Sequence, residues 1–220
     1  LSLEDVMALT AAGVTTIQPG IEALSTALLR RMDKGVLARQ NIALLRHARA
    51  VGLDMSWNLL WAFPGDEPEA YEETLALLPL LGHLQPPATV TPLNIDRFSP
   101  YFQRPLAYGI SELRPHPSYH DVFPARTDIH KIAYCFVGDY ASGSLRSPGT
   151  IRQIKDEVAA WRARWAAADR ALPVLRVDPL GDSYLLRDTR GLPGAPEALL
   201  LDAGEARAVL RQARYVPGQA

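Results

Sequence analysis

The chain has 220 residues, of which 48% are apolar, and it carries a formal net charge of -1 with a pI of about 6.6. This balance excludes the basic surface that is typical of nucleic-acid-binding proteins, and polar residues or prolines interrupt every apolar stretch before it reaches membrane length. The single cysteine, Cys135, excludes a disulfide or a multi-thiolate metal site within this chain. We therefore expect a soluble, cytosolic protein with neither a nucleic-acid nor a membrane partner.

Up to Asp96 the sequence alternates between helix and strand patterns. Apolar residues recur at helical spacing and stop at Gly13 and Gly52, which are natural helix ends. The expected elements are helices over 3–12, 27–32, 36–51 and 68–84, and strands over 14–18, 54–63 and 88–96. Mostly apolar strands that alternate with helices predict a parallel sheet covered by helices. In such proteins, functional residues lie at the carboxyl ends of the strands.

Beyond Tyr101 the pattern becomes irregular. Residues 103–127 are rich in proline and predict a loop, and residues 129–140 predict a strand. The later elements are expected to be a helix over 150–168, a hairpin over 172–190, a strand over 197–202 and a helix over 203–215. Trp161 and Trp165, four residues apart, predict a packing stripe against the main body. We place a domain boundary near Gly149, between residues 1–149 and 150–220.

The unusual residues collect at the carboxyl ends of the three expected strands. The first strand ends in Gln18-Pro19-Gly20-Ile21-Glu22. Pro and Gly can simply set a strand-to-helix turn here, with Ser25 capping the helix. The same residues suit a ligand, because Gly lets it approach the backbone and Gln and Glu offer hydrogen bonds.

The other two strand ends also allow two interpretations. Pro64-Gly65-Asp66 is explained by a turn before a helix, whereas the apolar strand before it could form the wall of an adenine site. The third strand leads into NIDRFSPYF, where Asp96 and Arg97 form either a local ion pair or a binding site in which Arg97 holds a carboxylate. The histidines do not have the spacing of a metal site, and Cys135 is expected to be a small buried apolar residue.

Five stretches, taken together, resemble one enzyme family. They are IQPGIEALS, LLRRMDKGV, NIALLRHARAVGL, SWNLLWAFPGDEPEAY and NIDRFSPYF. In this order and spacing they resemble the second half of radical SAM enzymes that have an amino-terminal cobalamin-binding domain. The most similar subgroup is the ribosomal peptide natural-product maturation radical SAM protein 1 family. The resemblance covers residues 1–140 and extends more loosely through 190.

The resemblance implies an α/β fold in which residues 1–149 are the carboxyl-terminal half of a (β/α)₆ partial TIM-like barrel, followed by a small α+β extension. In such enzymes a 4Fe–4S cluster, held by a CxxxCxxC loop, cleaves S-adenosylmethionine to a 5′-deoxyadenosyl radical, and cobalamin-dependent members often methylate unactivated carbons. Tyr101 is implied to line the substrate side. The residues implied to contact S-adenosylmethionine are Gln18, Gly20, Glu22, Asn58, Leu60, Ala62, Asp96 and Arg97.

The chain also departs from the family. Ala23 stands where the family usually has Ser, and Asn58 and Ala62 replace the small residues common on the corresponding strand. The cluster-binding CxxxCxxC, the first barrel strands and a cobalamin domain are absent. We therefore expect the carboxyl-terminal part of a longer enzyme, inactive alone, whose partners are a precursor peptide and the missing amino-terminal part. The alternative is a non-catalytic half-barrel module that binds a peptide or a partner protein.

Overall fold

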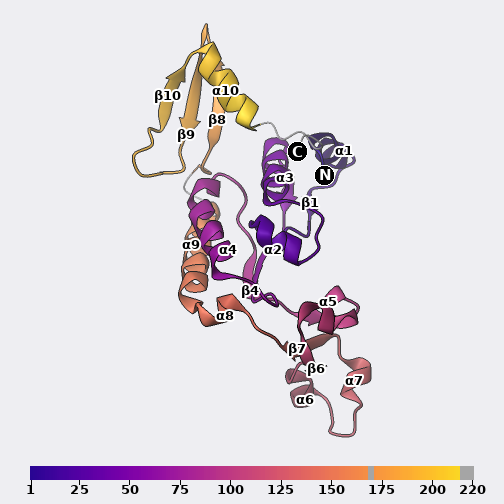
Figure 1. Cartoon of the computed structure of the whole chain (residues 1–220). Helices are drawn as coiled ribbons and strands as arrows, with labels where there is room; N and C mark the ends of the chain where they lie inside the picture. The colour runs from indigo at the N-terminus through magenta and orange to yellow at the C-terminus, as the bar shows by residue number, and fades with distance from the viewer. Residues whose placement is uncertain (168–170, 214–220) are drawn as a thin grey trace.

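Three parallel strand segments form the centre of the computed structural model, which describes residues 1–167 and 171–213 (Figure 1). A parallel bridge between Glu22 and Leu59 connects two pairs of strands, so that segments 16–22, 54–61 and 89–92 follow one another side by side. This is the order that the alternating helix and strand patterns predicted. The paired strands are β1 (Thr16–Ile17) with β2 (Asp54–Met55) and β3 (Asn58–Trp61) with β4 (Thr89–Pro92).

Helices connect these strands and bury their apolar sides. Gly52 ends the longest connecting helix, α3, in the left-handed conformation at φ 76°, as the sequence predicted. Among the described residues no helix is long and apolar enough to cross a membrane. The helices of this part are α1 (Leu3–Ala11), α2 (Thr26–Arg31), α3 (Ala38–Val51), α4 (Pro68–Leu77) and the 3₁₀-helix η1 (Leu78–Leu81).

Two local expectations are corrected. The strand expected over 54–63 is divided into β2 and β3, because the Trp57 side chain turns inward between them and its Nε1 donates to the Gln85 carbonyl at 3.0 Å. Trp57 is fully buried, so this division places a large ring in the core. Ser25 does occupy the N-cap position of α2, but its buried hydroxyl makes no capping hydrogen bond.

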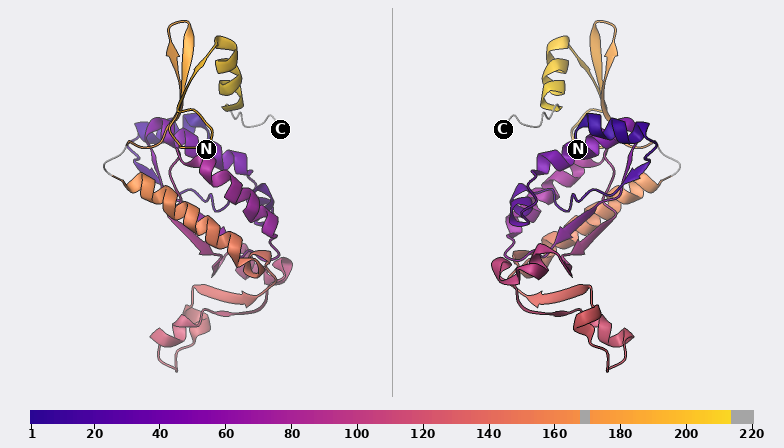
Figure 2. Two further views of the ribbon diagram at one scale, coloured as in Figure 1. Left: turned by 90° about the vertical axis from the view of Figure 1, so that its left-hand side faces the viewer. Right: turned by 90° about the vertical axis from the view of Figure 1, so that its right-hand side faces the viewer.

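The helix α9 (Pro148–Ala166) packs along α4, as two views in Figure 2 show. Trp161 donates from its indole nitrogen to the Leu84 carbonyl at 2.9 Å, and Trp165 donates to the Gly82 carbonyl at 3.0 Å. Trp161 also meets Trp57 edge to face, with ring centroids 6.3 Å apart. The expected tryptophan packing stripe is therefore confirmed. The boundary near Gly149 stays a prediction, and the end of the helix expected at Ala168 lies outside the described residues.

A second small sheet lies at one end of the molecule, in order β5-β7-β6 (Figure 1). The prediction of a loop over 103–127 is wrong, because this segment contains two short helices and a strand. Residues 129–132 are helical, and only the later part of the strand expected over 129–140 is a strand. The elements are β5 (Ile95–Asp96), α5 (Pro100–Gln103), η2 (Pro105–Tyr108), β6 (Ser111–Pro115), α6 (Ser118–Val122), α7 (Ile129–Ile132), β7 (Cys135–Asp139) and α8 (Gly143–Arg146).

The opposite end carries the hairpin that the sequence predicted, with its turn at Gly181-Asp182 (Figure 2). A third strand completes an antiparallel sheet in order β10-β9-β8. Arg190 attaches this sheet to the main body, because its Nη1 donates to the Leu80 carbonyl at 2.7 Å while it pairs with Asp188 at 2.6 Å. The elements are β8 (Leu175–Leu180), β9 (Ser183–Asp188), β10 (Ala198–Leu201) and α10 (Ala203–Ala213).

Candidate functional site

The first two central strand segments each have a non-glycine residue in the left-handed backbone region at their carboxyl end, and another such residue follows β5 of the second sheet. These residues are Glu22 at φ 55°, Ala62 at φ 60° and Phe98 at φ 73°. Such a conformation costs a non-glycine residue about 1–2 kcal/mol, so the surrounding structure must hold it in place. Strained backbone of this kind gathers at ligand sites, and here Glu22 and Ala62 mark the edge at which the carboxyl ends of the first two segments meet.

A charged pair and a hollow lie at the end of the first segment. Glu22 Oε1 pairs with Lys34 Nζ at 2.7 Å, and both side chains are about 30% exposed. Gly20 lies against this pair, because a Cβ on Gly20 would approach Lys34 Nζ to 3.3 Å. Gly20 and Lys34 also line a hollow of about 650 Å³ between α1 and α3, which is within the size range of small-molecule sites. The chain therefore offers a carboxylate and an ammonium group beside an open volume.

The end of the second segment is held by residues from far along the chain. Ala62 is buried, its N–H donates to Ser144 Oγ at 3.1 Å, and its carbonyl accepts from the Tyr140 hydroxyl at 2.9 Å. Gly65 N–H donates to the Ala141 carbonyl at 2.6 Å. Arg31 reaches the same turn and donates from Nη1 to the Pro64 carbonyl at 3.3 Å.

Asp66 is a fully buried carboxylate in this turn. Its Oδ2 accepts from Phe63 N–H at 3.1 Å, from the Tyr71 hydroxyl at 2.5 Å and from Ser144 Oγ at 2.7 Å. Its Oδ1 accepts from Ser144 N–H at 3.3 Å. Burial alone would raise the pKa of Asp66, but the hydrogen bonds from Tyr71, Ser144 and Ser142 outweigh burial and lower it. The carboxylate is thus charged at neutral pH, and its hydrogen bonds connect the turn to Tyr71 and Ser144.

Polar side chains surround the end of the third segment. Asn94 Nδ2 donates to Asp96 Oδ1 at 2.7 Å, and Cys135 Sγ lies 3.8 Å from the same oxygen. Cys135 is half-buried and contacts polar groups, which corrects the expectation of a buried apolar residue. A second hollow, of about 500 Å³, is lined by Asn94, Tyr140 and His116. One hollow therefore lies beside the end of the first segment, and the other lies beside the residues that follow the third.

Arg97 has structural partners in this arrangement. Its Nε donates to the Ala133 carbonyl at 2.6 Å, and its Nη2 donates to the His130 carbonyl. The guanidinium lies over the rings of Phe102 and Phe136, 5.2 and 5.0 Å from their centroids. Arg97 therefore ties the strand end to the segment before β7, and neither of the two sequence interpretations foresaw this role.

Tyr101 lies buried near the edge, with its ring 4.6 Å from that of Tyr108 between centroids. Its hydroxyl makes no hydrogen bond with any described residue. Burial raises the pKa of Tyr101, Tyr108 and Glu22 raise it further, and Arg31 lowers it. The charged residues that act on Tyr101 are Glu22 and Arg31, which belong to the first segment and the helix after it. A buried hydroxyl without a partner is a group that a ligand can satisfy.

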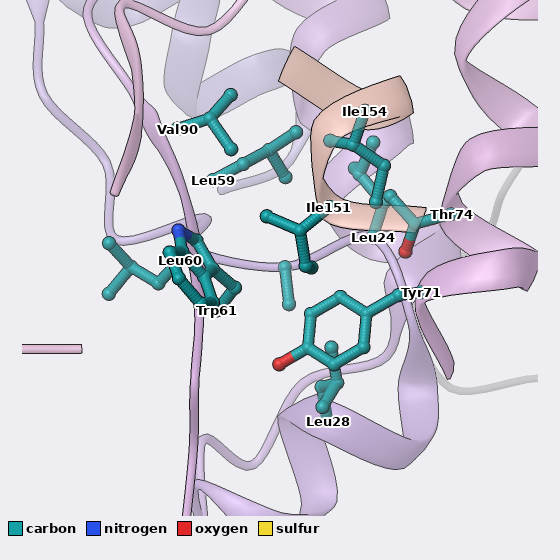
Figure 3. Close-up of a pocket in the computed structure, with 11 residues that line it drawn as sticks. Leu24, Leu28, Leu59, Leu60, Trp61, Tyr71, Thr74, Val90, Ile151 and Ile154 are labelled. Carbon is teal, nitrogen blue, oxygen red and sulfur yellow. The ribbon is translucent and has the colours of Figure 1, made fainter. Parts of the chain in front are cut away.

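Three of the predicted site residues lie apart from this cluster. Gln18 is exposed, and Asn58 stands at the start of β3, where it accepts a hydrogen bond from Thr89 Oγ1 at 2.8 Å. Leu60 lines an apolar cavity of about 10 Å³ between β3, α4 and α9, with Tyr71 at its rim (Figure 3). That volume holds at most one water molecule, and its apolar wall gives water no partners, so this cavity is a packing gap.

The described residues bring no three His, Cys, Asp or Glu side chains together in a group that could hold a metal ion. Lys34, Arg31, Tyr140 and Ser144 were missed by the sequence interpretation, because no local pattern connects them with the strand ends. Comparison of the sequence with models of known protein families gave no match, and comparison with curated proteins gave none either.

Proposed function

We propose that this chain supplies one wall of an S-adenosylmethionine site in a radical SAM enzyme that modifies a ribosomally made precursor peptide. The three parallel segments are then consecutive strands of a (β/α)₆ partial barrel, and residues from 150 onward form an extension to it. The observation that supports this proposal is the edge at which the carboxyl ends of adjacent parallel segments meet, with Glu22 and Ala62 there in left-handed conformations. Ligands of α/β proteins bind at such an edge.

The residues at this edge fit the chemistry of S-adenosylmethionine. Its methionine part carries an ammonium and a carboxylate group, and Glu22 and Lys34 offer the two complementary charges beside Gly20. Its adenine needs an apolar wall, which we assign to the turn from Ala62 to Gly65, although the Ala62 N–H and carbonyl and the Gly65 N–H already bond within the chain. The buried Tyr101 hydroxyl, without a partner among the described residues, is available to a ribose hydroxyl.

The iron–sulfur cluster does not fit the residues described. A 4Fe–4S cluster needs several thiolate ligands, whereas this chain has a single cysteine that contacts Asn94 and Asp96. The cluster and any cobalamin would supply the radical chemistry from outside this sequence. The residues of this chain would bind and orient S-adenosylmethionine.

The antiparallel sheet offers an outer strand at which a precursor peptide would dock. β8 is an outer strand, paired with β9 on one side and with no described strand on the other. An extended peptide can add to such an edge through main-chain hydrogen bonds. Titration of the labelled chain with precursor-derived peptides should perturb the backbone amides of β8. Perturbation of other amides alone would contradict this docking mode.

The proposed activity is tested on the full-length product of the reading frame that encodes this chain, prepared without oxygen and supplied with iron and sulfide. We expect 5′-deoxyadenosine to form from S-adenosylmethionine. The variant Gly20→Val should weaken S-adenosylmethionine binding about tenfold or more, because its side chain enters the space beside Lys34 and Glu22. Gln18→Ala, on an exposed side chain outside the cluster, serves as the control.

Two results would oppose this assignment. If no cluster absorbance and no 5′-deoxyadenosine are detected, the enzymatic role is wrong. If the protein then still binds a peptide or a partner protein, the alternative of a non-catalytic binding module replaces it.

A further inference from the structure

The segment from Tyr140 to Ser144 makes an unusually dense set of contacts with the turn after β3. It follows β7 and lies about 80 positions away in the sequence, yet it contacts Ala62, Gly65 and Asp66 through both backbone and side-chain hydrogen bonds. Neither the sequence pattern of this segment nor that of the turn predicts that the two lie in contact. We call residues 140–144 the clamp segment.

Ala62 is held at both its backbone groups by the clamp segment. Tyr140 donates its hydroxyl hydrogen to the Ala62 carbonyl, and Ser144 Oγ accepts from the Ala62 N–H. These two bonds fix the peptide groups on either side of a left-handed residue. Because that conformation is unfavourable for alanine, the bonds oppose a return of Ala62 to an ordinary strand conformation.

Ser144 has a full set of hydrogen-bond partners. Its hydroxyl donates to Asp66 Oδ2 at 2.7 Å, accepts from the Ala62 N–H and lies 3.0 Å from Ser142 Oγ. A hydroxyl has one donor and two acceptor positions, so this geometry satisfies it fully. Ser144 is also almost completely buried. The network therefore has one arrangement in which every member is paired, which favours a rigid turn.

Gly143 shows how closely the two backbones approach. Its N–H donates to the Asp66 carbonyl at 3.0 Å, and a Cβ on Gly143 would lie 2.7 Å from that carbonyl oxygen and 2.7 Å from Pro68 Cδ. No side chain fits there without moving one backbone away from the other. The clamp segment and the turn thus form one packed unit.

We propose that Tyr140 and Ser144 are positioning residues for ligand binding: they hold Ala62 in its left-handed conformation and so shape the adenine side of the site. This inference rests on the proposed function for the identity of the ligand. It goes further because it assigns a role in binding to a segment outside the three strands. Its structural part, the control of Ala62 by the clamp segment, is measurable without any ligand.

The first measurement is hydrogen exchange at the amides of Ala62 and Gly65 in the ligand-free chain. Tyr140→Phe and Ser144→Ala should each raise exchange there about fivefold or more, because each removes a hydrogen bond worth about 1 kcal/mol. Two variants serve as controls. Tyr134→Phe removes an exposed phenol outside the clamp segment, and Thr74→Val removes a buried hydroxyl that bonds only within α4. In both, the amides of Ala62 and Gly65 should exchange as in the wild type. Unchanged exchange in Tyr140→Phe would overturn the inference.

The second measurement is S-adenosylmethionine affinity, read from amide shifts during titration. Tyr140→Phe should bind about fivefold more weakly than Tyr134→Phe. The double variant Tyr140→Phe/Ala62→Gly should recover most of that loss, because glycine adopts positive φ without the cost that alanine bears. If the role of Tyr140 were merely structural, Ala62→Gly would not restore the affinity for S-adenosylmethionine that Tyr140→Phe loses.

The outcomes separate the two proposals. If exchange rises in Tyr140→Phe but the wild-type chain shows no affinity for S-adenosylmethionine, the proposed function fails and the clamp on Ala62 stands. If the wild type binds and Tyr140→Phe binds equally well, or the double variant shows no recovery, the positioning role fails and the proposed function stands. Should Ser144→Ala not fold, the Tyr140 variants decide the matter alone.

Discussion

Replacement of the buried carboxylate of Asp66 tests the account of the turn after β3. In Asp66→Ala, the Phe63 N–H, the Tyr71 hydroxyl and both the N–H and the hydroxyl of Ser144 lose their acceptor. Each buried donor without a partner costs about 1–3 kcal/mol. We therefore expect a loss of about 3–5 kcal/mol in the free energy of unfolding, which is at the upper end for a single substitution.

The assay is urea unfolding followed by the fluorescence of the buried tryptophans Trp57 and Trp161. In Asp66→Asn the free energy of unfolding should fall by less, about 1–2 kcal/mol, because the side chain keeps one oxygen acceptor. The remaining loss arises because its amide N–H lies against the Ser144 N–H. The matched control is Thr74→Val, which removes a buried hydroxyl of α4 that lies outside the Asp66 network.

The pH dependence of this effect has a fixed sign. The pKa of Asp66 is lowered in the folded protein, so its contribution is complete above the unfolded pKa of about 3.9 and is lost as pH falls through the folded value. The stability gap between wild type and Asp66→Asn should therefore shrink in acid below about pH 4. A loss under about 1 kcal/mol in Asp66→Ala at neutral pH would refute the buried-network reasoning.

Three further predictions concern the ends of the molecule. Burial, followed by the charge of Arg190, lowers the pKa of His83 to about 4. The free energy of unfolding, measured with urea, should therefore fall by about 2 kcal/mol from about pH 6.5 to about pH 4, and it should change less over this range in His83→Gln. Arg190→Met leaves the half-buried Asp188 carboxylate without its partner and should cost about 2 kcal/mol, with faster proteolysis of the sheet β10-β9-β8; unaltered proteolysis would show that Arg190 does not attach the sheet. Arg97→Lys keeps the charge but loses the two-carbonyl geometry, and it should lower the melting temperature by several degrees; an unchanged melting temperature would contradict a structural role.

The central fold was largely predictable because its signals are local. Helix ends at Gly13 and Gly52, and apolar strands between them, follow from backbone preferences and periodicity within a few residues. The Pro-rich segment 103–127 was not predictable in this way. Its strand β6 forms only by pairing with β7, a partner that no local pattern identifies.

The candidate site was predictable only in part, for the same physical reason. Gly20, Glu22 and Ala62 stand at strand ends, so the alternating pattern alone places them at one edge. Tyr140 and Ser144 reach that edge through long-range hydrogen bonds, and their short Gly- and Ser-rich segment looks like an ordinary turn. The direction of a side chain such as Arg97, toward backbone carbonyls and not toward a ligand, depends on packing that sequence spacing does not encode.

The most direct test of the central claim is titration of the isotopically labelled chain with S-adenosylmethionine at millimolar concentration, followed through its backbone amide resonances. Binding at the strand-end edge should give saturable shifts at Gly20, Glu22, Ala62 and Gly65, and adenosine alone should give smaller shifts that are confined to Ala62 and Gly65. The absence of any saturable shift at these four amides would contradict the claim that this edge binds S-adenosylmethionine.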